Sequence, residues 1–133
     1  MEKECHNIFE EMYRRKQFTW SDAVKKGKII AISGTVATDL NHRTVHAGDL
    51  EGQVRHIYES VKRLLESMGA HMDDVIKTTD YIAPGAVADY VKTAAIRREY
   101  FREGSYPAAA GVVVHSLLRP DWLIEIDFLA VVD

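Results

Sequence analysis

The spacing of apolar residues predicts a long amphipathic helix in the middle of the chain. From Leu50 to Met68 they recur every three or four positions, which is the period of a helix with one buried face. Asp49 is a good N-cap, and its negative charge suits the positive end of the helix dipole. Gly69 is suited to the left-handed position that ends a helix. We expect this helix to cover one face of a sheet.

A second helix is predicted after the Pro84-Gly85 pair, which ends the preceding strand. Its charged residues, including Arg97 and Arg98, are expected to lie mainly in solvent. The positions expected to face the core are Val87, Tyr90, Val91, Ala94 and Phe101.

Runs of β-branched and apolar residues predict five strands. The first two, over residues 18–24 and 29–34, form a hairpin in which Gly27 can take a positive φ. A third covers residues 75–82. Two closing runs lie on either side of Arg119-Pro120-Asp121 and are expected to be neighbouring strands. In the last run Ile124, Ile126 and Phe128 alternate with polar residues, so Glu125 and Asp127 share the face away from the core.

The order β-β-α-β-α-β-β predicts an α+β fold with one mixed sheet and both helices on one face. Residues 18–133 are expected to form this single domain, after a polar N-terminal arm over residues 1–17 that contains the basic residues 14–16. The other sheet face also needs cover, since it would otherwise expose apolar surface. Val113, Leu129 and Val131 are candidates for that face, and self-association would cover them.

Composition narrows the functional classes. The 133 residues carry a net charge of -3, which gives no basic footprint for a nucleic acid. The single cysteine, Cys5, cannot form an internal disulfide and fits a reducing compartment. The chain has no apolar run of about 20 residues and no signal-peptide pattern at its start. We expect a cytoplasmic protein without a membrane or nucleic-acid partner.

Two histidines lie close together in a predicted exposed loop over residues 38–48. His42 and His46 have a spacing that would suit a shared metal ion only on a helix, and no helix is predicted there. No carboxylate or thiol cluster nearby completes such a site. We therefore expect no metal.

Several short motifs resemble the RidA/YjgF family, from about Phe18 to the end of the chain. They are Ile30–Gly34, Asp49–Gln53, Leu64–Ala70, Asp73–Thr79, Pro107-Ala108 before a valine-rich strand, and the closing frame Ile124-Glu125-Ile126-Asp127. The resemblance implies a chorismate-mutase-like homotrimer with clefts between subunits. Many members hydrolyse enamines or imines there, without a metal or organic cofactor.

The resemblance also implies positions for a site. Deaminating members have an arginine that binds a substrate carboxylate, a cysteine, a glutamate that activates water and an N-terminal tyrosine. In this chain these positions hold Ala109, Gly111, Glu125 and Trp20, so only the glutamate is kept. Losing an arginine fork should weaken binding of a small imino acid by several kcal/mol.

Other candidate residues have two interpretations each. Ser33 and Gly34 either line the cleft or allow close backbone approach. His115 shares a strand face with Gly111 and is either an acid–base group or a rim histidine. Glu125 is either the catalytic carboxylate or a structural hydrogen-bond acceptor. Lys77 and Arg119 either replace the missing arginine or are surface charges.

The sequence thus predicts an enamine or imine hydrolase that acts on a small molecule other than the usual 2-imino acids. A deaminase for an aminomuconate-like substrate is one concrete form. In this prediction Glu125 positions water, the Gly111 amide holds a developing oxyanion, and Trp20 stacks on the substrate. The alternative is a non-catalytic, metabolite-binding or chaperone-like trimer on the same scaffold. A nuclease is disfavoured by the charge.

Overall fold

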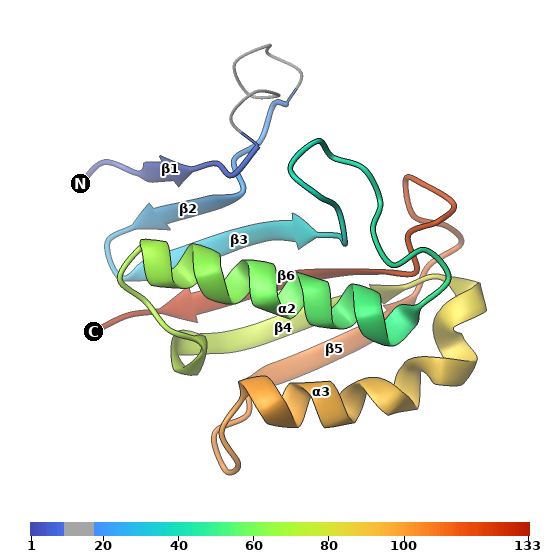
Figure 1. The fold of residues 1–133 in the computed structure, drawn as a ribbon. Coiled ribbons are helices and arrows are strands. Elements are labelled where there is room, and N and C mark those ends of the chain that lie inside the picture. Colours follow the sequence, from blue (N-terminus) through green and yellow to red (C-terminus); the bar gives the residue numbers. More distant parts are fainter. Residues whose placement is uncertain (10–17) are drawn as a thin grey trace.

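The computed structural model describes residues 1–9 and 18–133. These form a six-stranded sheet in the order β1-β2-β3-β6-β4-β5 with two α-helices on one face (Figure 1). The strands are β1 (Glu4–His6), β2 (Ala23–Lys26), β3 (Ile29–Thr35), β4 (Val75–Ile82), β5 (Ala108–Val113) and β6 (Ile124–Val131). The helices are α2 (Leu50–Ser67) and α3 (Thr93–Tyr100), with 3₁₀ segments over Met72–Asp74 and Pro84–Lys92. This architecture confirms the predicted α+β fold.

Local signals placed the hairpin and the first helix correctly. Gly27 turns between β2 and β3 with φ of 61°. The Asp49 carboxylate accepts a hydrogen bond of 3.0 Å from the Gly52 amide, so it caps α2 as predicted. Gly69 takes φ of 76° just after the end of α2. None of the helices in the described part of the chain is long and apolar enough to cross a membrane.

The N-terminal residues contain a strand that the sequence did not predict. Glu4–His6 form β1, which pairs antiparallel with β2 at the edge of the sheet and stays largely exposed to solvent. The first predicted strand also begins later, because β2 starts at Ala23 and not at Phe18. The basic residues 14–16 lie outside the described residues.

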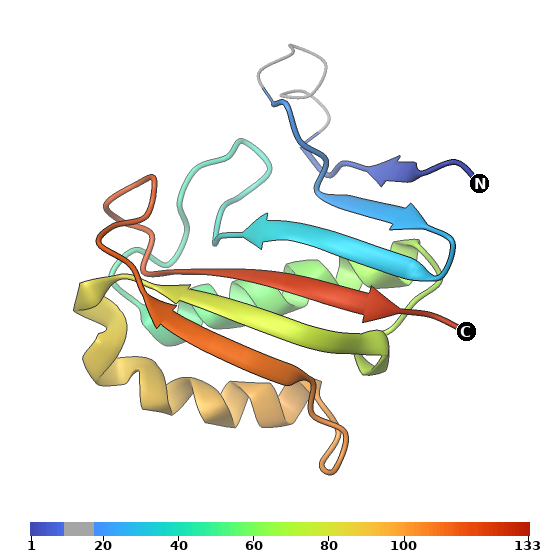
Figure 2. The same cartoon turned by 180° about the vertical axis from the view of Figure 1, so that it is seen from behind.

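The two closing strands are not neighbours, as the sequence had suggested. β6 lies between β3 and β4 and is antiparallel to both, whereas β5 pairs parallel with β4 at the other edge. The crossover through α3 explains the parallel pairing, because a helix carries the chain back along the sheet. The view from behind shows β5 at the edge and no helix over this face (Figure 2).

The second helical segment differs from its prediction. Val87 and Val91 are 48% and 77% exposed, because this stretch winds as a 3₁₀ helix with about three residues per turn and points other positions inward. Ala94 is exposed too. Ala86, Thr93, Ile96 and Phe101 are the buried residues of this region.

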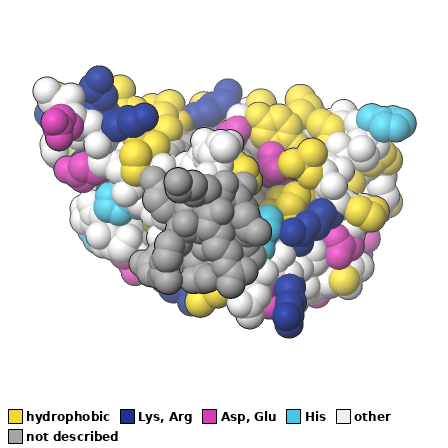
Figure 3. Space-filling view, turned by 90° about the horizontal axis from the view of Figure 1, so that it is seen from above, with side chains coloured by type: hydrophobic (Ala, Val, Ile, Leu, Met, Phe, Trp, Pro, Cys, Tyr) yellow, Lys and Arg dark blue, Asp and Glu magenta, His cyan; other side chains and the backbone are white. Residues whose placement is uncertain are grey.

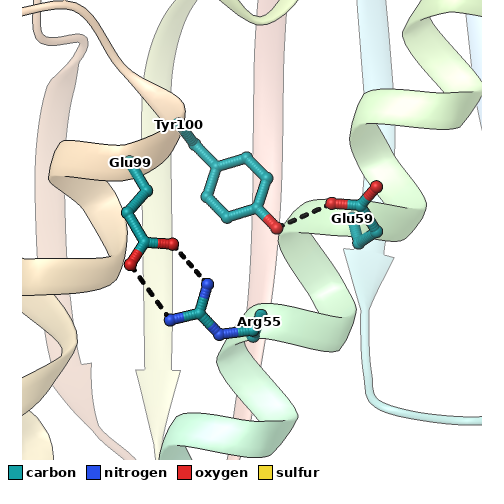
Figure 4. A network of polar contacts seen from close by, with 4 residues as sticks. All are labelled: Arg55, Glu59, Glu99 and Tyr100. Carbon is teal, nitrogen blue, oxygen red and sulfur yellow. Dashed lines mark hydrogen bonds and ion pairs between the residues drawn. The ribbon is translucent and has the colours of Figure 1, made fainter.

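Arg97 is not a solvated charge. Its guanidinium donates hydrogen bonds to the Tyr58 hydroxyl (2.7 Å) and the Thr78 hydroxyl (3.1 Å), between the helices and the sheet. Nearer the surface, two further contacts join the helices (Figure 4). Arg55 of α2 pairs with Glu99 of α3, and the Tyr100 hydroxyl donates to Glu59 at 2.7 Å. An exposed ion pair such as Arg55–Glu99 adds little stability.

The apolar core lies between the helices and the sheet. Its α2 side consists of Val54, Ile57, Tyr58, Val61, Leu64 and Leu65, and its sheet side includes Ile30, Ile32, Ile124, Ile126 and Phe128. Leu129 and Val131 alternate with these residues and lie on the open face, as predicted. Val113 does not, because it pairs with Ile82, whose side chain points toward the helices.

Candidate functional site

A cavity of about 370 Å³ opens beside β3 and β6, near the end of β3. Its lining comes from the segment before β2, from β3 and the loop after it, from α2 and from β6. The lining residues are Ile8, Phe9, Phe18, Trp20, Asp22, Ser33, Gly34, Thr35, Val36, Thr38, His42, Ser60, Val61, Leu64, Leu118, Trp122 and Glu125. Seen from above, apolar side chains gather on this side of the molecule, with charged and histidine side chains among them (Figure 3).

Glu125 reaches the cavity because position 34 has no side chain. A Cβ atom at Gly34 would lie 2.6 Å from Oε2 of Glu125 and 2.8 Å from its Cδ, so any larger residue would displace the carboxyl group. The register of β3 and β6 shifts between Ile32 and Thr35, at this same point. Burial raises the pKa of the Glu125 carboxyl, and the nearby charge of Asp127 raises it further.

Ser33, beside this contact, makes hydrogen bonds within the protein. Its hydroxyl donates to the Ser21 carbonyl at 2.6 Å, and its amide donates to the Asp22 carbonyl at 2.9 Å. These bonds tie β3 to the segment that carries Trp20. Ser33 therefore positions the cavity wall, and its contact with a ligand stays a prediction.

Aromatic rings form one side of the cavity. Phe18 and Trp20 stack with their ring centroids 4.2 Å apart, and Phe9 meets Phe18 edge-on at 5.8 Å. Trp122, which is buried, donates from its indole nitrogen to the Thr44 hydroxyl at 3.0 Å. Flat rings arranged in this way suit a flat ligand. Trp20 thus lines this cavity of one protomer, and its contact with a substrate stays a prediction.

Asp22 is a second carboxyl in the cavity. Its Oδ2 accepts a hydrogen bond of 2.6 Å from the Ile8 amide. Burial nevertheless raises the pKa of Asp22, because desolvation outweighs the backbone hydrogen bonds and the nearby His42. The sequence prediction missed Asp22. Trp20 and Asp22 both lie in bends before β2, so strand alternation gave no signal for this carboxyl group.

His42 lines the cavity and is tied to Arg119. One Arg119 nitrogen donates to the His42 carbonyl at 2.6 Å, and the other lies 2.9 Å from Nδ1 of the ring. The Arg119 guanidinium also lies over the Trp122 ring, 4.8 Å from its centroid. Burial lowers the pKa of His42, and the Arg119 charge lowers it further. No sequence signal pointed to this role, because the pairing spans two loops.

The two histidines of the loop have different partners. His46 has its ring 6.0 Å from that of His56, whereas His42 contacts Arg119. Within residues 1–9 and 18–133, no group of three or more histidine, cysteine, aspartate or glutamate side chains is placed to hold a metal ion.

Three predicted site residues lie elsewhere in the protomer. A Cβ at Gly111 would be 3.3 Å from the Tyr90 hydroxyl, so this position faces the helix side of β5. Ala109, two residues earlier, has the same orientation, and His115 lies exposed beyond the end of β5. Since β4 separates β5 from β6, one protomer does not bring these residues to Glu125.

Lys77 lies beside Leu129 on the open face and does not line the cavity.

The fold and the site together define a small α+β domain with a carboxyl group in an aromatic-walled cavity. A family model described as Endoribonuclease L-PSP matches residues 15–132. The chain is 36% identical over 123 residues to a RutC family protein of Pyrococcus horikoshii, covering 92% of this chain and 94% of that protein. It is 38% identical over 108 residues to the 3-aminoacrylate deaminase RutC of Acinetobacter baylyi, covering 81% and 82%.

Solved structures agree with these sequence matches. A member of the YjgF family from Mycobacterium tuberculosis superimposes with a TM-score of 0.80 at 21% identity, over 98% of this chain and 100% of that one. RidA from an Antarctic Psychrobacter gives a TM-score of 0.77 at 25% identity, over 86% and 89%. The chain belongs to the RidA/YjgF family.

Proposed function

We propose that this protein hydrolyses a C=N or enamine bond of a small molecule other than a small 2-imino acid. The observation that carries the proposal is Glu125, whose carboxyl lies against Gly34 in an aromatic-walled cavity with its pKa raised. A carboxyl whose pKa is raised is a stronger base when ionised and can take and return a proton. The similarity to a protein named 3-aminoacrylate deaminase supports this class of reaction.

The proposed reaction needs only water and proton transfer. Glu125 takes a proton from water while the water oxygen bonds to the imine carbon, and it passes this proton to the nitrogen to give a carbinolamine. Glu125 then takes the hydroxyl proton of the carbinolamine and passes it to the same nitrogen as the C–N bond breaks. Ammonia or an amine leaves, a carbonyl remains, and Glu125 is again ionised. Trp20 would stack on the substrate, and the Gly111 amide of a neighbouring protomer would hold the developing oxyanion.

The charges of the cavity residues indicate which net charge the substrate should have. Among its described lining residues there is no lysine or arginine, and two are acidic, Asp22 and Glu125. Ala109 also lacks the guanidinium that would bind a carboxylate. A small 2-imino acid would therefore bind poorly. An aminomuconate-like substrate would have to keep its carboxylates at the cavity mouth, and an uncharged cyclic imine avoids that cost.

Steady-state kinetics on 2-iminopropionate, 2-aminomuconate and a panel of cyclic imines test the proposal. We expect turnover of at least one larger substrate and little turnover of 2-iminopropionate. Glu125→Gln should lower kcat/KM by about 100-fold or more, the scale of a lost general base. No turnover of any of these compounds, or full activity in Glu125→Gln, would contradict it.

Asp127→Asn is the matched control on the same strand face. Asp127 accepts a hydrogen bond from Tyr81 at 3.0 Å and does not line the cavity. Removing its charge should lower the raised pKa of Glu125. If ionised Glu125 is the base, activity rises with pH through that pKa. The acid limb of the pH–rate profile should therefore move to lower pH in Asp127→Asn, with the plateau retained.

A non-catalytic metabolite-binding or chaperone-like trimer is the second candidate. It is favoured by Ala109 and Gly111, which lack the side chains of the deaminating members. A ligand-induced rise in melting temperature without turnover, abolished in Glu125→Ala, would support it. The nuclease suggested by the family description would instead require RNA binding that weakens steeply with salt. We do not expect such binding at a net charge of -3.

A further inference from the structure

The contact between Arg119 and His42 determines which ring nitrogen of His42 carries the proton. An arginine guanidinium stays charged in proteins and can only donate hydrogen bonds. Its nitrogen lies 2.9 Å from Nδ1 of His42, so Nδ1 must be the acceptor. The ring is then neutral, with its proton on Nε2. The lowered pKa of His42 agrees with this state.

The same contacts hold the ring in place. Arg119 also donates to the His42 carbonyl at 2.6 Å, and its guanidinium stacks on Trp122. The His42 ring meets Phe9 and Phe18 edge-on, each with centroids 5.2 Å apart. Among the described residues, only Nδ1 of the ring takes part in a hydrogen bond. Its Nε2–H has no partner within residues 1–9 and 18–133, and His42 is among the residues that line the cavity.

We propose that His42 is a ligand-binding residue of this cavity, whose Nε2–H donates a hydrogen bond to an uncharged acceptor atom of a flat ligand. The acceptor is a carbonyl oxygen or an imine nitrogen. Arg119 is the positioning residue, since it fixes the tautomer of His42. The inference rests on the proposed function in that the ligand occupies the same cavity as the substrate.

A neutral imidazole suits this role chemically. It donates to an atom that gains negative charge during reaction without giving up its proton, because its own conjugate base is too strong. Proton transfer stays with Glu125. The described lining residues include no lysine or arginine but two carboxyl groups, those of Asp22 and Glu125, so with His42 as a neutral donor the cavity should bind uncharged acceptors better than anions.

The tautomer can be observed without any ligand or substrate. In the full-length protein with ¹⁵N-labelled histidine, long-range ¹H–¹⁵N spectra at pH 7 should show His42 with a protonated Nε2 and an unprotonated Nδ1. A proton on Nδ1, or a charged ring at this pH, would overturn the inference.

The positioning role of Arg119 is tested by the pKa and the tautomer of His42 in the Arg119→Gln variant. The charged groups that act on the His42 ring are Arg119, Asp22 and Asp39. In Arg119→Gln the two aspartates remain, so the pKa of His42 should rise toward or above its ordinary value and the two tautomers should mix. An unchanged spectrum would show that Arg119 does not position the ring.

Binding tests the donor with three probes of similar shape. Benzamide has a neutral carbonyl acceptor, benzylammonium has none, and benzoate is an anion. Quenching of the fluorescence of Trp20 and Trp122, which line the cavity, reports binding. We expect His42→Phe to weaken benzamide binding about tenfold and to leave benzylammonium binding unchanged. Benzoate should bind weakest to the unchanged protein.

Two variants keep this test decisive. His42→Gln places an N–H donor near the position of Nε2 and should retain benzamide binding within about threefold. His46→Phe is the matched control, because His46 lies in the same loop with a similar φ (56° against 60°) and does not line the cavity. It should change no binding constant. Equal losses for benzamide and benzylammonium in His42→Phe, or no loss for benzamide, would overturn the inference.

These outcomes are separable from failure of the proposed function. If no imine is turned over but His42→Phe loses benzamide selectively, the hydrolase proposal fails and the binding role of His42 stands. If an imine is turned over at the same rate by His42→Phe and by the unchanged protein, the hydrolase stands and the role of His42 fails.

Discussion

Asp80 is a carboxyl that the fold buries almost completely, with 5% of the residue exposed. Its Oδ2 accepts a hydrogen bond from the Tyr90 hydroxyl, whereas Oδ1 has no hydrogen-bond partner among the described residues. Desolvation raises the pKa of Asp80, although Tyr90 and Arg97 act in the other direction. The protonated form is therefore favoured by folding.

This burial predicts how stability depends on pH. Because the folded pKa of Asp80 lies above its ordinary value of 3.8, its contribution to stability is fully present below that value. It is lost as pH rises through the folded pKa. The asparagine side chain in Asp80→Asn cannot ionise. The free energy of unfolding of this variant, relative to that of the unchanged protein, should therefore increase as pH rises from 4 to 7.

Urea denaturation at a series of pH values measures this difference. Asp89→Asn is the control, since Asp89 is exposed and forms only a surface ion pair with Lys92. Its difference from the unchanged protein should vary much less with pH. A constant offset between Asp80→Asn and the unchanged protein would mean that Asp80 is already ionised in the folded state at pH 4.

At the scale of elements, local sequence signals predicted the ends of one helical region correctly but did not predict the winding of the other. α2 begins and ends where its N-cap and its glycine predict, because both act through hydrogen bonds within a few residues. The stretch over Pro84–Lys92 has similar apolar spacing but winds as a 3₁₀ helix. Ala86 is the buried residue of this stretch, and its Tyr90 hydroxyl donates to Asp80 of β4.

The glycine that ends α2 makes a measurable prediction. At Gly69, φ is 76° and no atom lies within 4 Å of an added Cβ, so the cost of a side chain there is one of backbone conformation alone. Gly69→Ala should lower the free energy of unfolding by about 1 kcal/mol. Gly85→Ala is the control, because its surroundings are equally open without a positive φ. Equal stability of both variants would refute the left-handed cap.

At the scale of the whole molecule, the sheet face away from the helices carries apolar side chains that the protomer itself does not cover. Leu129 lies there between Ala31 and Lys77 on the neighbouring strands, and Ile29 and Val131 beside it are 55% and 38% exposed. β5 lies at the sheet edge and carries Ala109 and Gly111, which the family resemblance assigns to the cleft. A neighbouring protomer would have to bring them to Glu125.

We therefore expect a homotrimer in solution. Sedimentation velocity should give a species of three times the chain mass, and Leu129→Arg on the open face should shift it to the monomer and abolish turnover. Leu40→Arg, in an exposed loop at 73% exposure, should leave the trimer intact. If the protein without substitutions sediments as a monomer, the proposed cleft between protomers does not exist.

Sequence patterns pointed to some of the cavity residues and not to others. The sequence predicted Glu125 and Trp20 as site residues of a cleft between subunits, from the family resemblance and, for Glu125, from alternation along its strand, and both line the cavity of one protomer. Their roles toward a ligand stay predictions. Asp22, His42 and Trp122 were not predicted as cavity residues. They come from three separate segments that carry no shared pattern, and only folding brings them together.

The amino-acid sequence by itself determined the helix caps, the hairpin and the direction in which each residue of β6 points. These depend on backbone preferences and periodicity within a few residues. The tertiary structure alone decided the strand order, the burial of Asp80 and Arg97, and the tie between Arg119 and His42. Such contacts join residues far apart in the chain, and the free energy of packing that selects them leaves no local periodic signal.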